Sequence, residues 1–272
     1  MCYGYDDLIK DIKALSAGGA RVGTAGKSLF GRNIWYAIVG NGFSGAMIFG
    51  AIHAREHITA KLVSSLAKNY RGRGVLFVPM VNPDGVELCK RGVTSAPENV
   101  RKSLLRLNGS DDFRAWKANG RAVDLNVNFD AGFGKGEKNR FSPAPENYVG
   151  PYPESEPESK ALLSLAKRFS VEKALCYHAK GEVIYYGYEN GEEDYSAAKT
   201  ISDLTGYVPL RSDGSHGGFK DYFIKTGKKA LTVEVGSDEK SYVGLYDEYD
   251  KIYRQNRPAL AAFTEKIWTK NT

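Results

Sequence analysis

Six short apolar runs, separated by segments with helical periodicity, constrain the fold of this chain more than any other feature. The runs are rich in β-branched and aromatic residues and have the length of strands buried on both faces. They are IWYAIV (34–39), AMIFGAI (46–52), VLFVPMV (75–81), KALCY (173–177), VIYYGY (183–188) and ALTVEV (230–235). Strands that alternate with amphipathic helices predict an α/β fold, a single domain over residues 1–272 with helices on both faces of its sheet.

Four helices are predicted from apolar residues that recur every three to four positions. They cover residues 5–15, 58–70, 155–169 and 246–268. The third begins with serine, proline and acidic residues, as helix N-termini do. The last is expected to be kinked or interrupted at Pro258. The stretch 82–155 is rich in glycine, proline and asparagine, so we expect loops over one sheet edge, where functional sites tend to lie.

Composition and charge exclude several classes of protein. The 272 residues are 42% hydrophobic, enough for a sizeable core, and no apolar run approaches the roughly 20 residues that span a bilayer. The N-terminus lacks the features of a secretory signal, which favours the cytoplasm unless a leader has been removed. The three cysteines form no C-x-x-C pair, so a disulfide framework or a zinc–thiolate site is not expected. The net charge of +6 comes from scattered basic residues without a nucleic-acid-binding module, so no nucleic-acid partner is expected.

The segment GNGFSG (40–45) matches the G-x-G-x-x-G pattern of dinucleotide-binding loops. That function requires a helix directly after the glycines, whereas the strand-like run AMIFGAI follows. The segment is therefore interpreted as a hairpin turn.

His53 and Glu56 stand directly after a predicted buried strand and are candidate metal ligands. In an H-x-x-E spacing an imidazole and a carboxylate converge on one ion, and zinc accepts both at about 2.0–2.2 Å. The carboxyl end of a strand is also where α/β sheets place their sites. The alternative is a core histidine followed by an acidic residue at a helix N-terminus, which an isolated short motif would favour.

His178 is the candidate third ligand, because it also ends a predicted buried strand, just before a glycine turn. Of the other histidines, His57 is expected on a helix surface and His216 in a flexible turn. A zinc ion with three protein ligands keeps a position for water, and that water needs a base. Glu234 lies inside an apolar strand, where a carboxylate is costly unless it is paired, protonated or functional. It is the candidate base, and the alternative is a structural partner for a lysine.

Five ordered motifs resemble those of the zinc carboxypeptidases and extend over nearly the entire chain. They are HARE (53–56), NPDG (82–85), WKANGRAVDLNVNFDAGFG (116–134), YHAKGEV (177–183) and LTVEVG (231–236). The resemblance implies a mixed, roughly eight-stranded sheet flanked by helices. It also implies one zinc ion held by His53, Glu56 and His178, with Glu234 as the general base.

The resemblance implies roles for four further residues. Arg55 would contact a substrate carboxylate, and Asp124 would orient the first zinc histidine and fix its tautomer. Lys117 stands where the family has an arginine that stabilises the oxyanion, and a lysine supplies positive charge there without the planar fork. Asn126 matches the asparagine that contacts the terminal carboxylate of the substrate.

Two departures from the family pattern concern substrate recognition. Val127 replaces the arginine that pairs with the C-terminal carboxylate of a peptide, so that carboxylate would lack its two-pronged donor. Asp213 falls about where the family has a mobile tyrosine. With these departures, the segments WKAN, VDLN, YHAKGEVIYY and GGFKDYF resemble the bacterial γ-D-glutamyl-meso-diaminopimelate peptidases.

That branch implies hydrolysis of the γ-amide between D-glutamate and diaminopimelate in murein peptides. Diaminopimelate carries a charged amino-acid group on its side chain, so its pocket must bind a zwitterion, and Arg55, Asp213 and Lys220 are the candidate contacts. Three alternatives stay open: an ordinary metallocarboxypeptidase, a zinc amidase acting on a small acyl-amino acid, and an inactive cell-wall binding module. The intact metal ligands and the retained Glu234 argue against the inactive module.

Overall fold

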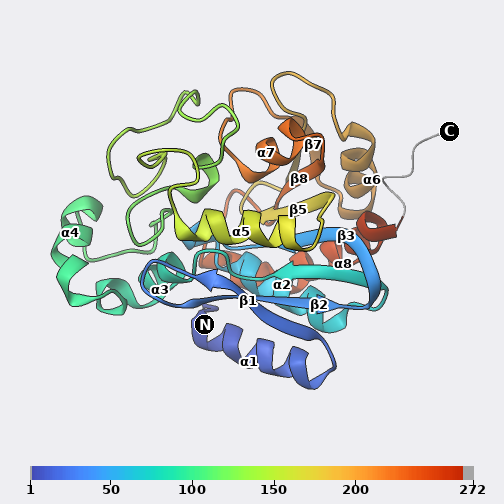
Figure 1. Ribbon diagram of the computed structural model, residues 1–272, viewed down its shortest axis with the longest axis horizontal. Coiled ribbons are helices and arrows are strands. Elements are labelled where there is room, and N and C mark those ends of the chain that lie inside the picture. The colour runs from blue at the N-terminus through green and yellow to red at the C-terminus, as the bar shows by residue number, and fades with distance from the viewer. Residues whose placement is uncertain (1, 266–272) are drawn as a thin grey trace.

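A mixed sheet forms the centre of the computed structural model, which describes residues 2–265 (Figure 1). Its strands are β1 (Arg21–Lys27), β2 (Asn33–Val39), β3 (Asn41–Phe49), β4 (Arg73–Val78), β5 (Lys173–His178), β6 (Val183–Tyr186), β7 (Val208–Arg211) and β8 (Lys229–Glu234). They are arranged in the order β1-β2-β4-β3-β5-β8-β6-β7. The predicted single α/β domain with a mixed, eight-stranded sheet is confirmed.

The four central strands, β4, β3, β5 and β8, run parallel to one another. Most residues of β4, β5 and β8 and the last four of β3 are buried, which explains why these parts of the sequence are continuous apolar runs. The register of β5 and β8 runs from Lys173 beside Lys229 to His178 beside Glu234. Because parallel strands end at the same edge of a sheet, the residues that end or follow β3, β5 and β8 are brought to one place.

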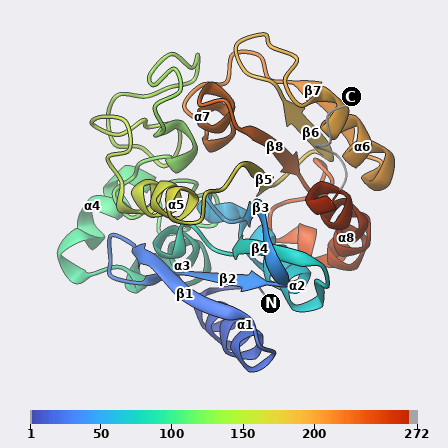
Figure 2. The ribbon, with the colours of Figure 1, turned by 45° about the vertical axis from the view of Figure 1, so that its right-hand side comes forward.

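Helices cover both faces of the sheet. They are α1 (Tyr5–Ala17), α2 (Ile58–Asn69), α3 (Pro83–Arg91), α4 (Glu98–Asn108), α5 (Pro157–Arg168), α6 (Tyr195–Thr205), α7 (Phe219–Lys225) and α8 (Tyr249–Glu265). One core cluster joins the sheet to α1, α2, α6 and α8, and the other joins its opposite face to α5 and α7. In Figure 2 the central strands lie between α5 on one side and α8 on the other.

Short 3-10 segments occur near the ends of the central strands and in the connecting loops. They are η1 (Ala54–Glu56), η2 (Gly92–Ser95), η3 (Leu125–Val127) and η4 (Gly244–Glu248). The loops expected over residues 82–155 are present only from residue 109 to residue 156, where η3 is the only helical segment. The expectation is wrong for residues 83–108, most of which form α3, η2 and α4. Within residues 2–265 no helix combines the length and the apolar character that a bilayer crossing requires.

The helices predicted from periodicity are present as α1, α2, α5 and α8. Helix α8 continues through Pro258 without interruption, whereas residues 266–268 of its predicted extent lie outside the described residues. The edge strands β1 and β7 were not predicted, since their residues are largely exposed or half-buried and carry no apolar run.

The interpretation of GNGFSG as a hairpin turn is wrong. Gly40 makes a tight turn with a φ of 102°, but residues 41–45 already belong to β3. Strands β2 and β3 do not pair, because β4 lies between them. A side chain at position 40 would collide with the carbonyl oxygen of Gly72, so this turn depends on glycine.

Asn82 ties together three backbone segments near the site edge. Its Oδ1 accepts a hydrogen bond from the N–H of Gly85 and caps α3, at 3.0 Å. Its Nδ2 donates to the carbonyl oxygens of Ile52 and Ala118, at 3.2 and 3.1 Å. The side chain is fully buried, so water cannot replace these bonds.

We expect Asn82→Ala to lower the free energy of unfolding by about 2–4 kcal/mol, because it removes a cap and leaves two buried carbonyl groups without a donor. Asn69→Ala is the matched control, since Asn69 is exposed and donates only to the carbonyl of Ser65. The control should change stability by less than about 0.5 kcal/mol. Urea denaturation measures both, and equal stability of the two variants would contradict the role of Asn82.

Glu158 is a buried acid in α5. Its carboxylate accepts hydrogen bonds from the N–H of Leu29 and from Nδ2 of Asn119, at 3.0 and 3.1 Å. Burial raises the pKa of Glu158 to about 7. The folded state therefore holds this proton more tightly than the unfolded chain, and the resulting stability is lost as the pH rises through 7.

Between pH 5 and pH 8, wild-type protein should lose about 2 kcal/mol of stability relative to Glu158→Gln, because one pKa unit corresponds to about 1.4 kcal/mol. Denaturation curves at several pH values measure this difference. Glu98→Gln, an exposed acid at the start of α4, should follow wild type throughout. Curves for Glu158→Gln that also stay parallel to wild type would show that the buried carboxyl does not titrate in this range.

Candidate metal centre

Three buried side chains from two segments converge where β3 and β5 end. His53 follows β3, Glu56 lies in η1, and His178 is the last residue of β5. Nδ1 of His53 lies 2.8 Å from Oε1 of Glu56 and 3.1 Å from Nδ1 of His178. The same nitrogen of His178 lies 3.1 Å from Oε2 of Glu56. Two imidazole nitrogens and a carboxylate therefore face one point.

The donor set fits one divalent metal ion. Ligand atoms about 2.0–2.2 Å from a tetrahedral zinc ion are about 3.3–3.6 Å apart, so the atoms of this cluster need to separate by only a few tenths of an ångström. Within residues 2–265 this is the one group of three histidine, cysteine or acidic side chains that could hold a metal ion. Two histidines and one glutamate are a ligand set of catalytic zinc sites.

The charges of the cluster compensate one another. Burial by itself would raise the pKa of Glu56, but the imidazoles of His53 and His178 hold it well below its usual range. Burial would lower the pKa of His53, yet the carboxylates of Glu56 and Asp124 raise it overall. Glu56 therefore stays ionised inside the protein, as a metal ligand must.

Asp124 approaches His53 from the side away from the cluster. It is fully buried, with Oδ1 3.3 Å from Nε2 of His53 and Oδ2 2.8 Å from Nζ of Lys117. A carboxylate at the far nitrogen favours the tautomer that leaves Nδ1 free for a metal ion. Asp124 also raises the pKa of Lys117 against the effect of burial, so the ammonium stays charged.

Glu234 lies beside the cluster because of the strand register. It ends β8 directly opposite His178, and paired strands lie about 4.8 Å apart. Side chains at paired positions leave the same face of a sheet, so the half-buried carboxyl of Glu234 and the imidazole of His178 share one face. Burial, together with the negative charge of Glu56, raises the pKa of Glu234 to about 8. A bound cation would lower this pKa, so the group can exchange protons near neutral pH.

Two of the predicted substrate contacts already have partners within the protein. The ammonium of Lys220, buried in the first turn of α7, donates to the carbonyl of Gly187 and to Oδ1 of Asp221, both at 2.6 Å. Asp213 follows β7, is exposed, and pairs with Nε of Arg211 at 3.2 Å. Contact of either residue with a substrate stays a prediction.

The third, Asn126, lies in η3 next to Asp124. Its Oδ1 accepts a hydrogen bond at 3.2 Å from the N–H of Phe219, where α7 begins. Its side chain therefore fixes the position of α7 relative to the loop that carries Asp124.

Arg55 contacts two residues that the sequence did not identify. Its Nη1 donates to Oε2 of Glu146 at 3.1 Å, and its guanidinium carbon lies 5.0 Å from the ring centre of Tyr242. Burial, followed by the charge of Glu56, raises the pKa of Tyr242. Neither residue belongs to a recognisable motif, because both lie in loops whose path depends on the complete fold.

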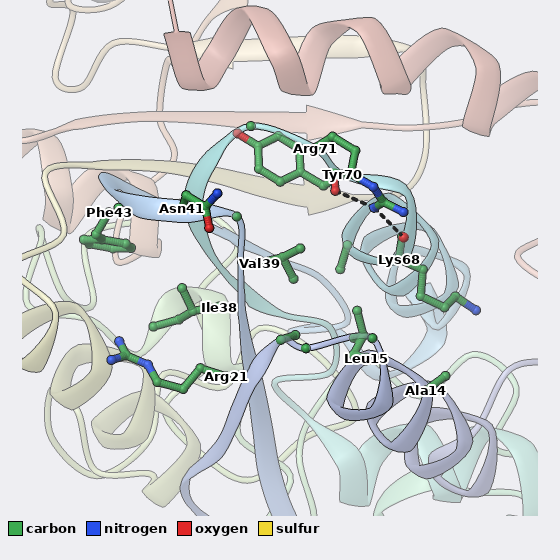
Figure 3. A pocket seen from close by; sticks show the side chains of 17 residues that line it. Ala14, Leu15, Arg21, Ile38, Val39, Asn41, Phe43, Lys68, Tyr70 and Arg71 are labelled. Carbon is green, nitrogen blue, oxygen red and sulfur yellow. Dashed lines mark hydrogen bonds between the residues drawn. The ribbon is translucent and has the colours of Figure 1, made fainter.

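A cavity of about 1000 Å³ opens at the other end of β3 (Figure 3). The ends of α1 and α2 and the turn between β2 and β3 line it, without an acidic residue or a histidine. Arg71 donates to the carbonyl oxygens of Lys68 and Tyr70 and thereby caps the end of α2. The length of β3 places this cavity roughly 26 Å from the cluster. Its lining contains no histidine, cysteine or acidic side chain that could hold a metal ion.

The sequence and the fold both match known proteins. Residues 5–256 match the family described as zinc carboxypeptidase. The chain is 33% identical to gamma-D-glutamyl-L-diamino acid endopeptidase 1 of Lysinibacillus sphaericus, over 93% of this chain and 70% of that protein.

Two solved structures share the fold at lower identity. The first is bovine thrombin-activatable fibrinolysis inhibitor in complex with tick carboxypeptidase inhibitor, with a TM-score of 0.77 at 19% identity over 98% of this chain and 97% of that chain. The second is the murein-tripeptide amidase MpaA from Escherichia coli O157, with a TM-score of 0.61 at 22% identity over 88% of this chain and 90% of that chain. The predicted resemblance and the predicted zinc cofactor are thereby confirmed. The chain belongs to the zinc carboxypeptidase family.

Proposed function

We propose that this zinc metallopeptidase hydrolyses the γ-D-glutamyl–diaminopimelate amide bond of murein peptides. The observation that carries the hydrolytic part is the convergence of His53, Glu56 and His178 with Glu234 beside them. Two observations support the substrate. Val127 stands where the family has the arginine that pairs with a C-terminal carboxylate, and the relative from Lysinibacillus sphaericus is named for a γ-D-glutamyl-L-diamino acid bond.

Glu234 acts as the general base in this proposal. Zinc, when bound by the cluster, would supply Lewis-acid activation of a water molecule and of the amide carbonyl. The carboxylate of Glu234 takes a proton from the attacking water and returns it to the nitrogen of the leaving diaminopimelate. The C–N bond breaks, and the glutamate side chain is released as a carboxylate.

Lys117 stabilises the negative charge that develops on the amide oxygen. Its ammonium has three N–H donors, and Asp124 takes one of them at 2.8 Å, so two remain for the oxygen. Asp124 at the same time holds His53 in the tautomer that binds metal. One buried carboxylate therefore positions both a metal ligand and a charge-stabilising group.

The zwitterionic end of diaminopimelate needs charges of both signs. Lys220 is assigned to a carboxylate and Asp213 to the ammonium group. Each would exchange its present partner, Asp221 or Arg211, for a substrate group of the same charge. Such an exchange conserves the pairing of the protein charges and makes recognition depend on both ends of the zwitterion.

Glu234→Gln should reduce hydrolysis of a γ-D-glutamyl–diaminopimelate peptide by at least about 10²-fold, because the amide cannot accept the proton of water. Zinc content, measured by mass spectrometry of the metal, should stay at one ion per chain. Glu239→Gln, an exposed acid in the loop that follows β8, is the matched control and should keep wild-type activity. Normal turnover by Glu234→Gln would rule out this residue as the base.

Defined murein tri- and tetrapeptides should be cut between D-glutamate and diaminopimelate, as mass spectrometry of the products will show. A chelator should abolish this cleavage, and added zinc should restore it. Removal of C-terminal residues from ordinary peptides instead would identify an ordinary metallocarboxypeptidase. Peptides that bind to zinc-loaded protein and stay intact would identify a binding module.

A further inference from the structure

The guanidinium of Arg55 is held by three separate segments of the chain. Nη1 donates to the carbonyl oxygen of Ala115 at 3.2 Å and to Oε2 of Glu146 at 3.1 Å. The guanidinium carbon lies 5.0 Å from the centre of the Tyr242 ring, and Nζ of Lys180 lies 6.0 Å from the same centre. The two acceptors at one nitrogen and the aromatic ring beside the group together restrict its position.

These contacts leave one edge of the guanidinium without a protein partner. Both protein acceptors engage Nη1. Nε is buried and has no hydrogen-bond partner within residues 2–265. The N–H groups of Nε and Nη2 point the same way, and this edge is the fork with which arginine binds a carboxylate through two parallel hydrogen bonds. A buried donor without a partner is unfavourable until a ligand supplies the acceptor.

A γ-linked substrate offers a carboxylate beside the reacting bond. In an ordinary peptide the α-carboxyl group of a glutamyl residue forms the next amide bond. In a γ-glutamyl peptide the side chain forms that bond, and the α-carboxylate stays free on the acyl side of the scissile amide. Arg55 directly precedes the proposed metal ligand Glu56 in η1, so the chain carries both residues to the same edge of the sheet.

We propose that Glu146 and Tyr242 are positioning residues that orient Arg55 so that its Nε–Nη2 edge binds the α-carboxylate of the D-glutamyl residue. This inference rests on the proposed function for its substrate. In this arrangement Arg55 selects the γ-linkage by binding the D-glutamyl residue, on the acyl side of the scissile bond. The diaminopimelate pocket binds the other side of that bond. Glu146 is 40% exposed, so its ion pair with Arg55 contributes little to folding and can be removed without unfolding the protein.

The test compares two peptides that differ in one group: D-glutamate with a free α-carboxylate, and D-isoglutamine, in which that carboxylate is an amide. Wild-type protein should show a KM at least about 10-fold lower for the free carboxylate, because one charged two-pronged contact is lost in the amide. Glu146→Gln should remove most of this preference through KM, with a change in kcat below about 3-fold. Tyr242→Ala should act in the same way, and Tyr242→Phe should retain the preference because the ring is what contacts Arg55.

Glu137→Gln is the matched control, since Glu137 is an exposed acid in the same long loop and the charge change is identical. Its KM ratio for the two peptides should equal that of wild type. A wild-type ratio in Glu146→Gln, or an equal loss for both peptides, would overturn the inference.

Calorimetric binding of both peptides to Glu234→Gln, with and without Glu146→Gln, separates this inference from the proposed function. Preferential binding of the free carboxylate that Glu146→Gln abolishes would support the inference even if neither peptide is cleaved by the wild type. Binding of neither peptide, or binding without preference, would refute it. Cleavage of both peptides at equal KM would leave the proposed reaction intact and refute the inference alone.

Discussion

The parallel alignment of β3, β5 and β8 is the constraint on which the site depends. The parts of these strands next to the site are mostly buried and apolar, and the polar residues of the cluster stand at the strand ends or just after them. His178 and Glu234 are neighbours because the register of two strands makes them so, and His53 follows the third strand at the same edge. The core that buries these strands therefore also determines the geometry of the candidate metal ligands.

The buried charged side chains at this edge of the sheet must also compensate one another. Glu56, Asp124 and Lys117 would each be costly alone, and the structure groups them with two imidazoles so that opposite charges lie within 2.8–3.3 Å. Glu234 is the exception, because burial and, after it, the negative charge of Glu56 raise its pKa. A bound metal ion would lower the pKa of both acids and offset the repulsion between their negative charges.

The sequence could predict those parts of the fold and of the candidate site that depend on a local pattern of residues. His53, His178 and Glu234 could be found because buried strands read as apolar runs and a polar residue at their end is conspicuous. The prediction of a hairpin at GNGFSG was wrong, because the sequence of a turn does not reveal that another strand, β4, lies between the two strands that the turn connects. Glu146 and Tyr242 could not be found, since their contacts with Arg55 exist only after two distant loops have met.

The loop-rich stretch between α4 and α5 and the sheet contribute different parts of the proposed site. The loops supply Lys117, Asp124, Asn126 and Glu146, whereas His178 and Glu234 end strands and His53 follows one. Asp124 connects the two parts, because its carboxylate lies 3.3 Å from Nε2 of His53 and 2.8 Å from Nζ of Lys117. A rearrangement of these loops that displaced Asp124 would therefore also disturb the buried histidine beside the sheet.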